Sequence, residues 1–152
     1  MATPEPDEIV DSPTEWVAKH VRRYVESDGR DGARNNGYDT LLITTRGRKS
    51  GKLRRTALIY GRHGDDHVVV ASNGGSDQHP AWYLNLLANP EVDVQVGADK
   101  FTAQARATDG EERAELWTMM VSVFPVYTGY QEKAHRTIPV VVLRRTADVH
   151  DG

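Results

Sequence analysis

The spacing of its strand-like runs limits the fold of this chain more than any other feature of the sequence. Consecutive apolar or alternating runs joined by short connections pair in an antiparallel sense, and the absence of strand–helix alternation excludes a doubly wound parallel sheet. We therefore predict an α+β or mainly β fold, a closed or split antiparallel β-barrel of about six strands. The predicted strands are 40–45, 55–62, 67–72, 92–96, 101–105 and 138–143.

Three helices are predicted beside the strands. From Pro13 an apolar stripe at helical spacing continues to Asp28 and Gly29, where the helix ends. A short helix over 80–88 begins at a proline and is apolar nearly all round, so it should be buried. A longer helix over 110–124 follows Asp109, a residue type that caps helices.

Length and composition restrict the functional classes. The 152 residues suit one domain, which we place at 13–147, between a flexible, Pro-rich lead-in (1–12) and a C-terminal tail (148–152). There is no cysteine, which excludes disulfides and thiolate chemistry, so any redox activity needs a cofactor. No apolar run approaches the ~18–20 residues of a membrane span, and we expect a cytoplasmic protein.

A cluster of positive charge lies between the first two predicted strands. Residues 44–56 carry six of the 19 Lys and Arg residues, no acid and two glycines, although the net charge of the chain is -3. Such a loop suits an anionic ligand tail, and charge so confined argues against a broad nucleic-acid-binding surface. It is not a P-loop, because three residues rather than four separate Gly47 from Gly51, and Lys52 precedes a leucine. A solvated hairpin tip is the alternative interpretation.

A second loop and two tyrosines are candidates for the same pocket. The loop 72–76 follows an apolar strand, and its glycines, Gly74 and Gly75, let backbone amides approach a planar ligand closely. Most aromatic side chains should fill the core, but Tyr127 and Tyr130 lie in a segment interrupted by proline and glycine, where a hydroxyl group can face a ligand. The histidines show no metal-ligand spacing, and we assign no metal site.

Four stretches of the sequence resemble a known family. They are LLITTRGRKSG (41–51), ASNGG (71–75), HPAWYLNLLANP (79–90) and TIPVVV (137–142). In this order, over about residues 38–145, they resemble the deazaflavin (F420)-dependent nitroreductase family, in particular its F420H2-dependent quinone reductase-like members. The resemblance implies a split β-barrel that binds coenzyme F420 and uses its reduced form to deliver hydride to quinones, nitroaromatics or similar small acceptors.

The resemblance also implies roles for individual residues. Arg48, Lys49 and Ser50 would hold the phosphate and glutamate tail of the coenzyme. Ser72, Tyr127 and Tyr130 are the candidate catalytic residues, as donors to the negative charge that develops on the acceptor. The residues implied in cofactor binding are Arg48, Lys49, Ser50, Arg54, Arg55, Thr56, Ala57, Leu58, Ile59, Val70, Ala71, Ser72, Asn73, Ala81, Trp82, Tyr83, Leu84, Asn85 and Tyr127.

Two departures from the family pattern bear on the acceptor. Ile59 and Phe124 stand where the nitroreductase that gives the family its name has tyrosines, so a more apolar pocket is implied, which favours quinones over nitro compounds. An FMN-dependent enzyme on a similar barrel and a non-enzymatic F420 carrier are the alternatives. The basic face of the first helix also allows peripheral contact with the inner face of the membrane, although packing of this helix on the barrel is the simpler expectation.

Overall fold

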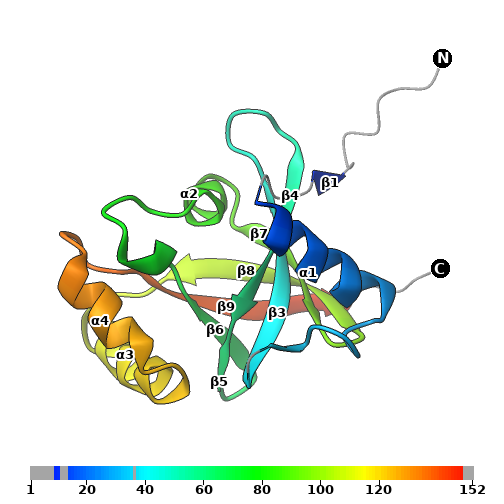
Figure 1. Ribbon diagram of the computed structural model, residues 1–152. Coiled ribbons are helices and arrows are strands. Elements are labelled where there is room, and N and C mark those ends of the chain that lie inside the picture. The colour runs from blue at the N-terminus through cyan, green and yellow to red at the C-terminus, as the bar shows by residue number, and fades with distance from the viewer. Residues whose placement is uncertain (1–8, 11–13, 36, 149–152) are drawn as a thin grey trace.

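A twisted sheet wrapped into an open barrel forms the centre of the molecule (Figure 1). The structure is a computed structural model that describes residues 9–10, 14–35 and 37–148. Its elements are β1 (Ile9–Val10), α1 (Glu15–Glu26), β2 (Arg34–Asn35), β3 (Tyr38–Arg46), β4 (Leu53–Ile59), β5 (Gly61–His63), β6 (Asp66–Val70), the 3-10 helix η1 (Asn73–Gly75), α2 (Ala81–Ala88), β7 (Glu91–Val96), β8 (Asp99–Ala107), α3 (Gly110–Val123), α4 (Val126–Lys133) and β9 (Val140–Asp148).

The strand order explains why the barrel stays open. The strands run β1-β4-β3-β7-β8-β9-β6-β5, and β2 pairs with β3 beside this path. Only Tyr60 separates β4 from β5 in the chain, although these two strands lie near opposite ends of the order. The chain therefore bends from one end of the sheet to the other without completing the hydrogen-bonded ladder. The barrel is split, and the split lies between β4 and β6.

The prediction of a split barrel is confirmed, but the predicted number of strands is too low. The described residues form nine strands rather than about six, because β1, β2 and β5 have only two or three residues each. Strands of this length carry no detectable periodicity. The sheet is also not wholly antiparallel, since β1 pairs in parallel with β4. β1 falls within the predicted lead-in 1–12, whose other residues lie outside the described part of the chain.

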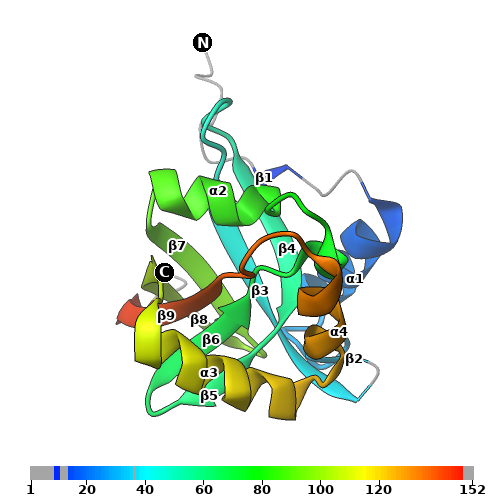
Figure 2. The ribbon, with the colours of Figure 1, turned by 90° about the vertical axis from the view of Figure 1, so that its left-hand side faces the viewer.

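Helices cover three sides of the barrel (Figures 1 and 2). α3 buries Leu116 and Met120, and α4 buries Tyr127, in the cluster on the outer face of β6 and β9, whereas α2 closes one end of the interior with Leu86. α1 packs on the face of β3 through Val21 and Tyr24, as expected for its apolar stripe. β6 is buried on both faces, which accounts for its unbroken valine run.

The sequence-predicted helices agree with α1, α2 and α3 within one or two residues at each end, but α4 was not predicted. Pro125 and Gly129 suggested an irregular segment, whereas Pro125 stands at the N-cap of α4 and Gly129 is an exposed residue within it. Proline is well tolerated where a helix begins. Tyr127 and Tyr130 are therefore presented by a helix. Within the described residues, none of the helices combines the length and the apolar character needed to span a membrane.

Two contacts hold α1 and the turn after it to the sheet. The hydroxyl group of Tyr24, which is fully buried, lies 3.0 Å from the carbonyl oxygen of Thr40 and accepts the Gly97 N–H at 2.7 Å. Gly29, just beyond the helix, has a φ of +85°, and a Cβ atom built on it would lie 2.3 Å from the Cα atom of Gly97. The two backbones approach so closely that only glycine fits at position 29.

Candidate functional site

The split in the barrel opens into a cavity of about 590 Å³, which we call the cleft. Its walls come from α1, β3, β4, β6, the η1 loop, α2 and the α3–α4 region. The lining residues are Thr14, Trp16, Val17, His20, Thr40, Thr56, Ala57, Leu58, Ile59, Val70, Ser72, Asn73, Gly74, Pro80, Trp82, Phe124, Tyr127 and Tyr130. Among these residues there is no Asp, Glu, Lys or Arg, so the described lining carries no fixed charge.

β4 presents an open backbone edge to the cleft. On one side it pairs with β3 along its whole length, but on the other side it pairs with β1 only at Leu53 and Arg54. In the described part of the chain, no strand pairs with Arg55–Ile59 on that second side. The N–H and C=O groups along such an edge can bind a flat ligand as they would bind another strand. Thr56–Ile59, four of the predicted cofactor-binding residues, lie here.

The loop between β6 and α2 forms the opposite wall and is held by Arg136. The Arg136 guanidinium donates to the carbonyl oxygens of Ser72 at 3.0 Å, Ser76 at 3.0 Å and Gln78 at 3.2 Å, and it lies 3.1 Å from Nδ1 of His79. Because arginine only donates, His79 Nδ1 is the acceptor. Sequence reasoning missed Arg136, since nothing in the sequence indicates that it meets carbonyl groups about 60 positions earlier.

The two glycines of this loop have different roles. Gly74 lines the cleft with a φ of +63°, and a Cβ atom on it would meet no atom within 4 Å. Gly75, at a φ of +82°, instead packs against α4, where its Cβ atom would lie 3.0 Å from the Cα atom of Tyr130. Only Gly74 therefore fits the predicted close approach to a ligand, whereas Gly75 lets the loop and α4 meet.

Aromatic side chains surround the part of the cleft below this loop. Phe124 and Tyr127 meet edge to face with centroids 4.9 Å apart, and Tyr130 lies 6.3 Å from Tyr127. Tyr127 is only 4% exposed, and its hydroxyl group has no hydrogen-bond partner in the described part of the chain. Burial, with a smaller contribution from Tyr130, raises the pKa of Tyr127 well above its usual value. Tyr127 therefore stays a neutral phenol that can donate a hydrogen bond.

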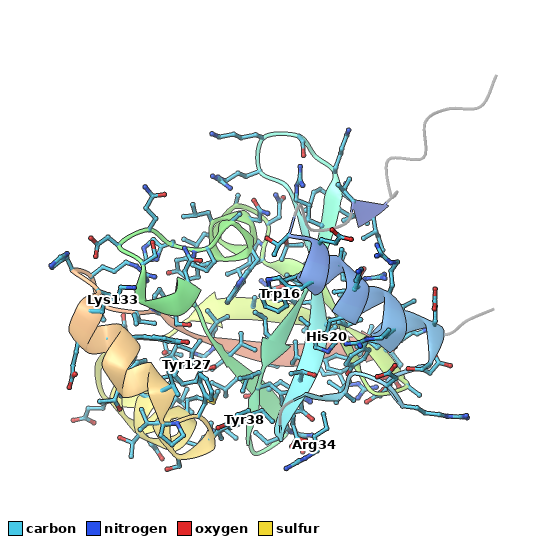
Figure 3. The ribbon with its side chains drawn as sticks, viewed as in Figure 1. Trp16, His20, Arg34, Tyr38, Tyr127 and Lys133 are labelled. Atoms are coloured by element: carbon cyan, nitrogen blue, oxygen red, sulfur yellow. The ribbon has the colours of Figure 1, made fainter. Side chains whose placement is uncertain are left out.

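The N-terminal helix contributes a wall that sequence reasoning did not assign to the site (Figure 3). Trp16 and His20, one helical turn apart, both line the cleft across from α4. Trp16 is 70% exposed, whereas His20 is 5% exposed. Their i, i+4 spacing was visible in the sequence, but its meaning depended on how α1 packs on the barrel.

The basic loop is the hairpin between β3 and β4, and it extends beyond the cleft beside α2 (Figure 2). Arg48 is tied to α2, because its backbone N–H and its guanidinium both donate to Asn85 Oδ1, at 3.2 and 3.0 Å. The side chains of Arg48, Lys49 and Ser50 are exposed, and no described carboxylate pairs with the two cations. The hairpin thus places positive charge next to α2, whose Trp82 lines the cleft.

Several predicted cofactor-binding residues do not line the cleft. Arg54 is exposed on the hairpin, and Arg55 faces a separate cavity of about 260 Å³ near α1, where it donates to Thr44 Oγ1. Ala71 and Tyr83 belong to the interior core, and Leu84 packs against it. Ala81 is exposed at the start of α2. By contrast Val70, Ser72, Asn73, Trp82 and Tyr127 all line the cleft together with β4.

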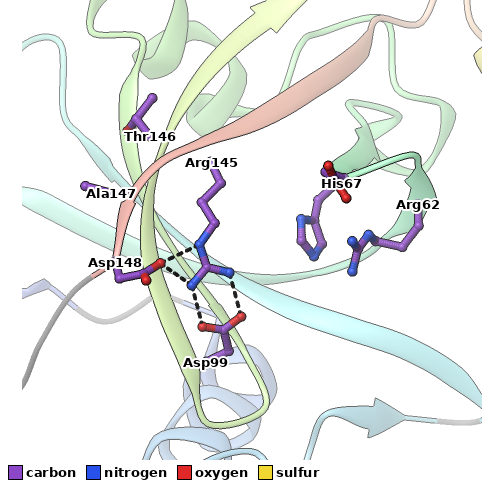
Figure 4. A pocket seen from close by; sticks show the side chains of 8 residues that line it. Arg62, His67, Asp99, Arg145, Thr146, Ala147 and Asp148 are labelled. Atoms are coloured by element: carbon purple, nitrogen blue, oxygen red, sulfur yellow. Dashed lines mark hydrogen bonds and ion pairs between the residues drawn. The ribbon is translucent and has the colours of Figure 1, made fainter.

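A second cavity, also of about 590 Å³, has a charged lining (Figure 4). Arg145 donates to both carboxylate oxygens of Asp99, at 2.9 and 2.8 Å, and to Asp148 at 2.6 Å, so its charge is already paired. His67 is 4% exposed, and its Nδ1 has no partner among the described residues. Burial, with Arg62 next in importance, lowers the pKa of His67 from 6.5 to about 4.

His67 should make the protein acid-sensitive. Because the pKa of this histidine is lower in the folded protein than in the unfolded chain, its contribution to stability is complete above pH 6.5 and is lost as the pH falls toward 4. We expect His67 to account for a loss of about 2–3 kcal/mol in the free energy of unfolding over this interval. Urea unfolding at a series of pH values should show this loss in the wild type and a shallower one in His67→Phe. Equal slopes would contradict it.

Comparison with known proteins gives one consistent result. A family model described as F420H2-dependent quinone reductase matches residues 16–145. An F420H2-dependent quinone reductase of Mycobacterium tuberculosis is 38% identical over 143 residues, which cover 86% of this chain and 96% of that protein. The structure of an F420H2-dependent reductase, FDR-A, is similar at a TM-score of 0.65 with 42% identity, over 69% of this chain and 93% of that one. A structure described as a domain-swapped dimer reaches 0.68 with 39% identity, over 88% and 100% of the two chains.

Proposed function

Because the chain belongs to the F420H2-dependent quinone reductase family, we propose that it catalyses hydride transfer from reduced coenzyme F420 to a quinone bound in the cleft. The observation that carries the proposal is the open edge of β4 facing an uncharged cleft, next to a cationic hairpin. A deazaflavin joins a flat ring to an anionic tail. The ring suits the uncharged cleft, and the tail suits the cationic hairpin.

The residues of the cleft fit such a coenzyme. The edge of β4 at Thr56–Ile59 and the loop at Ser72–Gly74 offer backbone groups on two sides, and Trp82 adds an aromatic surface. Arg48, Lys49 and Ser50 stand outside the cleft, where a tail that leaves past α2 would meet them. When bound, the reduced coenzyme supplies the hydride. The protein orients the ring, excludes water and stabilises the charge that develops on the acceptor.

The acceptor is proposed to bind in the cleft between Phe124, Tyr127 and Tyr130 on one side and α1, with His20, on the other. The lining between them is largely aromatic and holds no Asp, Glu, Lys or Arg, which suits a flat, poorly hydrated quinone. Tyr127 and Ser72 are the proposed donors to the acceptor oxygen, since a neutral phenol and a hydroxyl group can stabilise an oxyanion. Ile59 and Phe124 offer no hydroxyl group, which leaves quinones favoured over nitro compounds.

Peripheral contact with a membrane is a further part of the proposal. Trp16 is exposed at the mouth of the cleft, and Arg22 and Arg23 are exposed on the same helix. An aromatic side chain with nearby cations suits an anionic lipid surface. Flotation with anionic but not with neutral vesicles would support this contact, and no flotation with either would contradict it.

Ligand titration and turnover test the proposed activity. We expect F420 to bind with micromolar or tighter affinity, and its reduced form to be oxidised when menadione is added under anaerobic conditions. FMN that copurifies tightly with the protein would instead favour a flavin enzyme on the same barrel. Binding of F420 without turnover of any quinone in a panel would favour a carrier.

A further inference from the structure

The geometry points to His20 as the residue that delivers a proton to the acceptor, through its Nδ1 atom. This inference rests on the proposed quinone reduction, and it gives the cleft a proton donor that the hydrogen-bonding phenol of Tyr127 does not supply. Quinone reduction needs one hydride and one proton, so a site that shields the acceptor from water requires a protein group to carry that proton.

The first observation is that the orientation of the His20 ring is fixed. His20 Nε2 lies 2.8 Å from the carbonyl oxygen of Gly32, which also accepts a hydrogen bond from Thr40 Oγ1. Gly32 has a φ of +118°, and a Cβ atom there would lie 3.1 Å from the imidazole, so the ring rests directly against its backbone. His20 is 5% exposed, and this packing limits its rotation.

The second observation is that these contacts determine the tautomer. A carbonyl oxygen only accepts, so Nε2 must carry the hydrogen in both protonation states of His20. Nδ1 is then the nitrogen that gains and loses a proton. In the described part of the chain it has no hydrogen-bond partner, and His20 lines the cleft.

The third observation is that His20 differs in chemical type from the other residues that line the cleft. Of the described residues that line the cleft, it is the only histidine, the residue type that most often acts as a general acid in enzymes. Among the described residues, the titratable groups that pack on it or line the cleft with it are the phenol of Tyr24 on α1, with ring centroids 6.4 Å apart, and those of Tyr127 and Tyr130 across the cleft. Burial raises the pKa of both Tyr24 and Tyr127, which makes these phenols poorer acids.

The proposed reaction needs no reactant beyond the reduced coenzyme, the quinone and a proton that His20 takes from solvent. Hydride from the reduced coenzyme brings two electrons and one proton to the quinone, which becomes a hydroquinone monoanion while the coenzyme is oxidised. The Nδ1–H bond of the His20 imidazolium breaks, its electron pair stays on nitrogen, and a new O–H bond forms on the hydroquinone. Neutral His20, still bound to Gly32 through Nε2–H, then takes a proton from solvent at the mouth of the cleft.

Replacing His20 by glutamine separates proton donation from a purely structural role of the hydrogen bond to Gly32. In His20→Gln the side-chain amide can still donate to the Gly32 carbonyl group, but it cannot titrate. We expect its affinity for F420 to stay within about twofold of the wild type, whereas kcat with menadione falls by about 100-fold, within the usual range for general acid catalysis. In the wild type the rate should decline as the pH rises, because the protonated imidazole is the form that donates the proton. That decline should be absent in His20→Gln.

The matched control is His63→Gln. His63 is exposed and does not line the cleft, so this variant should behave as the wild type.

A second measurement does not depend on activity. Long-range 1H–15N spectra of the ligand-free protein should show neutral His20 with its hydrogen on Nε2. The Nδ1–H tautomer would overturn the inference. So would a His20→Gln variant that keeps kcat within about threefold of an active wild type together with the same pH profile, and this result would leave the proposed function intact. A wild type that reduces no quinone would instead overturn the proposed function, and the role of His20 with it.

Discussion

Replacing both Arg48 and Lys49 by alanine is expected to weaken the binding of F420 by about 5- to 150-fold, or about 1–3 kcal/mol. The two side chains are exposed on the β3–β4 hairpin with no carboxylate partner among the described residues, so their charge is available to the anionic tail. Because the attraction between exposed charges is screened, the difference between variant and wild type should shrink as salt is added. Fluorescence titration of F420 at low and high ionic strength measures both effects.

A matched control separates the local effect from the change in net charge. Arg30 and Arg144 are also exposed, and neither lines the cleft nor belongs to the hairpin. Replacing both by alanine removes the same two charges and should leave the affinity for F420 within about twofold, since these sites are not in contact with the tail. Equal affinities of the hairpin variant and the wild type at low salt would contradict the proposed role of Arg48 and Lys49.

Replacing Gly29 by alanine is expected to destabilise the fold by about 2–5 kcal/mol. One contribution is the positive φ of +85°, which a residue with a side chain adopts at a cost. The larger contribution is steric, because the new Cβ atom would lie 2.3 Å from the Cα atom of Gly97 and the turn after α1 would have to move away from the β7–β8 turn. Urea unfolding or thermal melting measures the loss.

Gly37 provides the comparison that isolates the steric contribution. Its φ of +84° is nearly the same, but a Cβ atom on it meets no atom within 4 Å. Gly37→Ala should therefore cost only the backbone strain, about 1–2 kcal/mol. Equal stabilities of the two variants would show that the close approach of Gly29 to Gly97 is relaxed in solution. Since α1 carries His20, Gly29→Ala should also lower turnover more than Gly37→Ala does.

The sheet could be predicted from the sequence because its long strands have marked patterns. The alternation in β7 and β8 and the valine run of β6 each reflect the surroundings of the strand, half-buried in the first case and buried on both faces in the second. The hairpin between β3 and β4 was predicted for the same reason, together with its charge. The resemblance, rather than any periodicity, supplied the residues of β4 that line the cleft, whereas the glycine pair after an apolar strand had already indicated the loop 72–76.

What could not be predicted depends on contacts between distant parts of the chain. The role of Arg136 exists only because the segment before β9 returns to the loop after β6. His20 received no role in the sequence analysis, because its tautomer depends on the carbonyl group of Gly32, twelve positions later. Arg55 was placed with its neighbours on β4, but alternation along a strand turns it toward another cavity. In each case the role of the residue depends on which part of the folded chain its side chain meets, and the sequence alone does not give that contact.

The open edge of β4 has a consequence for the protein without its coenzyme. A barrel that closed between β4 and β6 would satisfy this edge internally, whereas here no described strand pairs with this side of Thr56–Ile59, and the backbone groups that point outward can bind another molecule. In the proposed complex the coenzyme occupies the place of a missing strand, so its binding and the stability of the fold are coupled. At a free concentration 100 times the Kd, such a ligand adds about 2.7 kcal/mol to the free energy of unfolding. In that complex the concentration of coenzyme sets the stability of the fold as well as the rate of turnover.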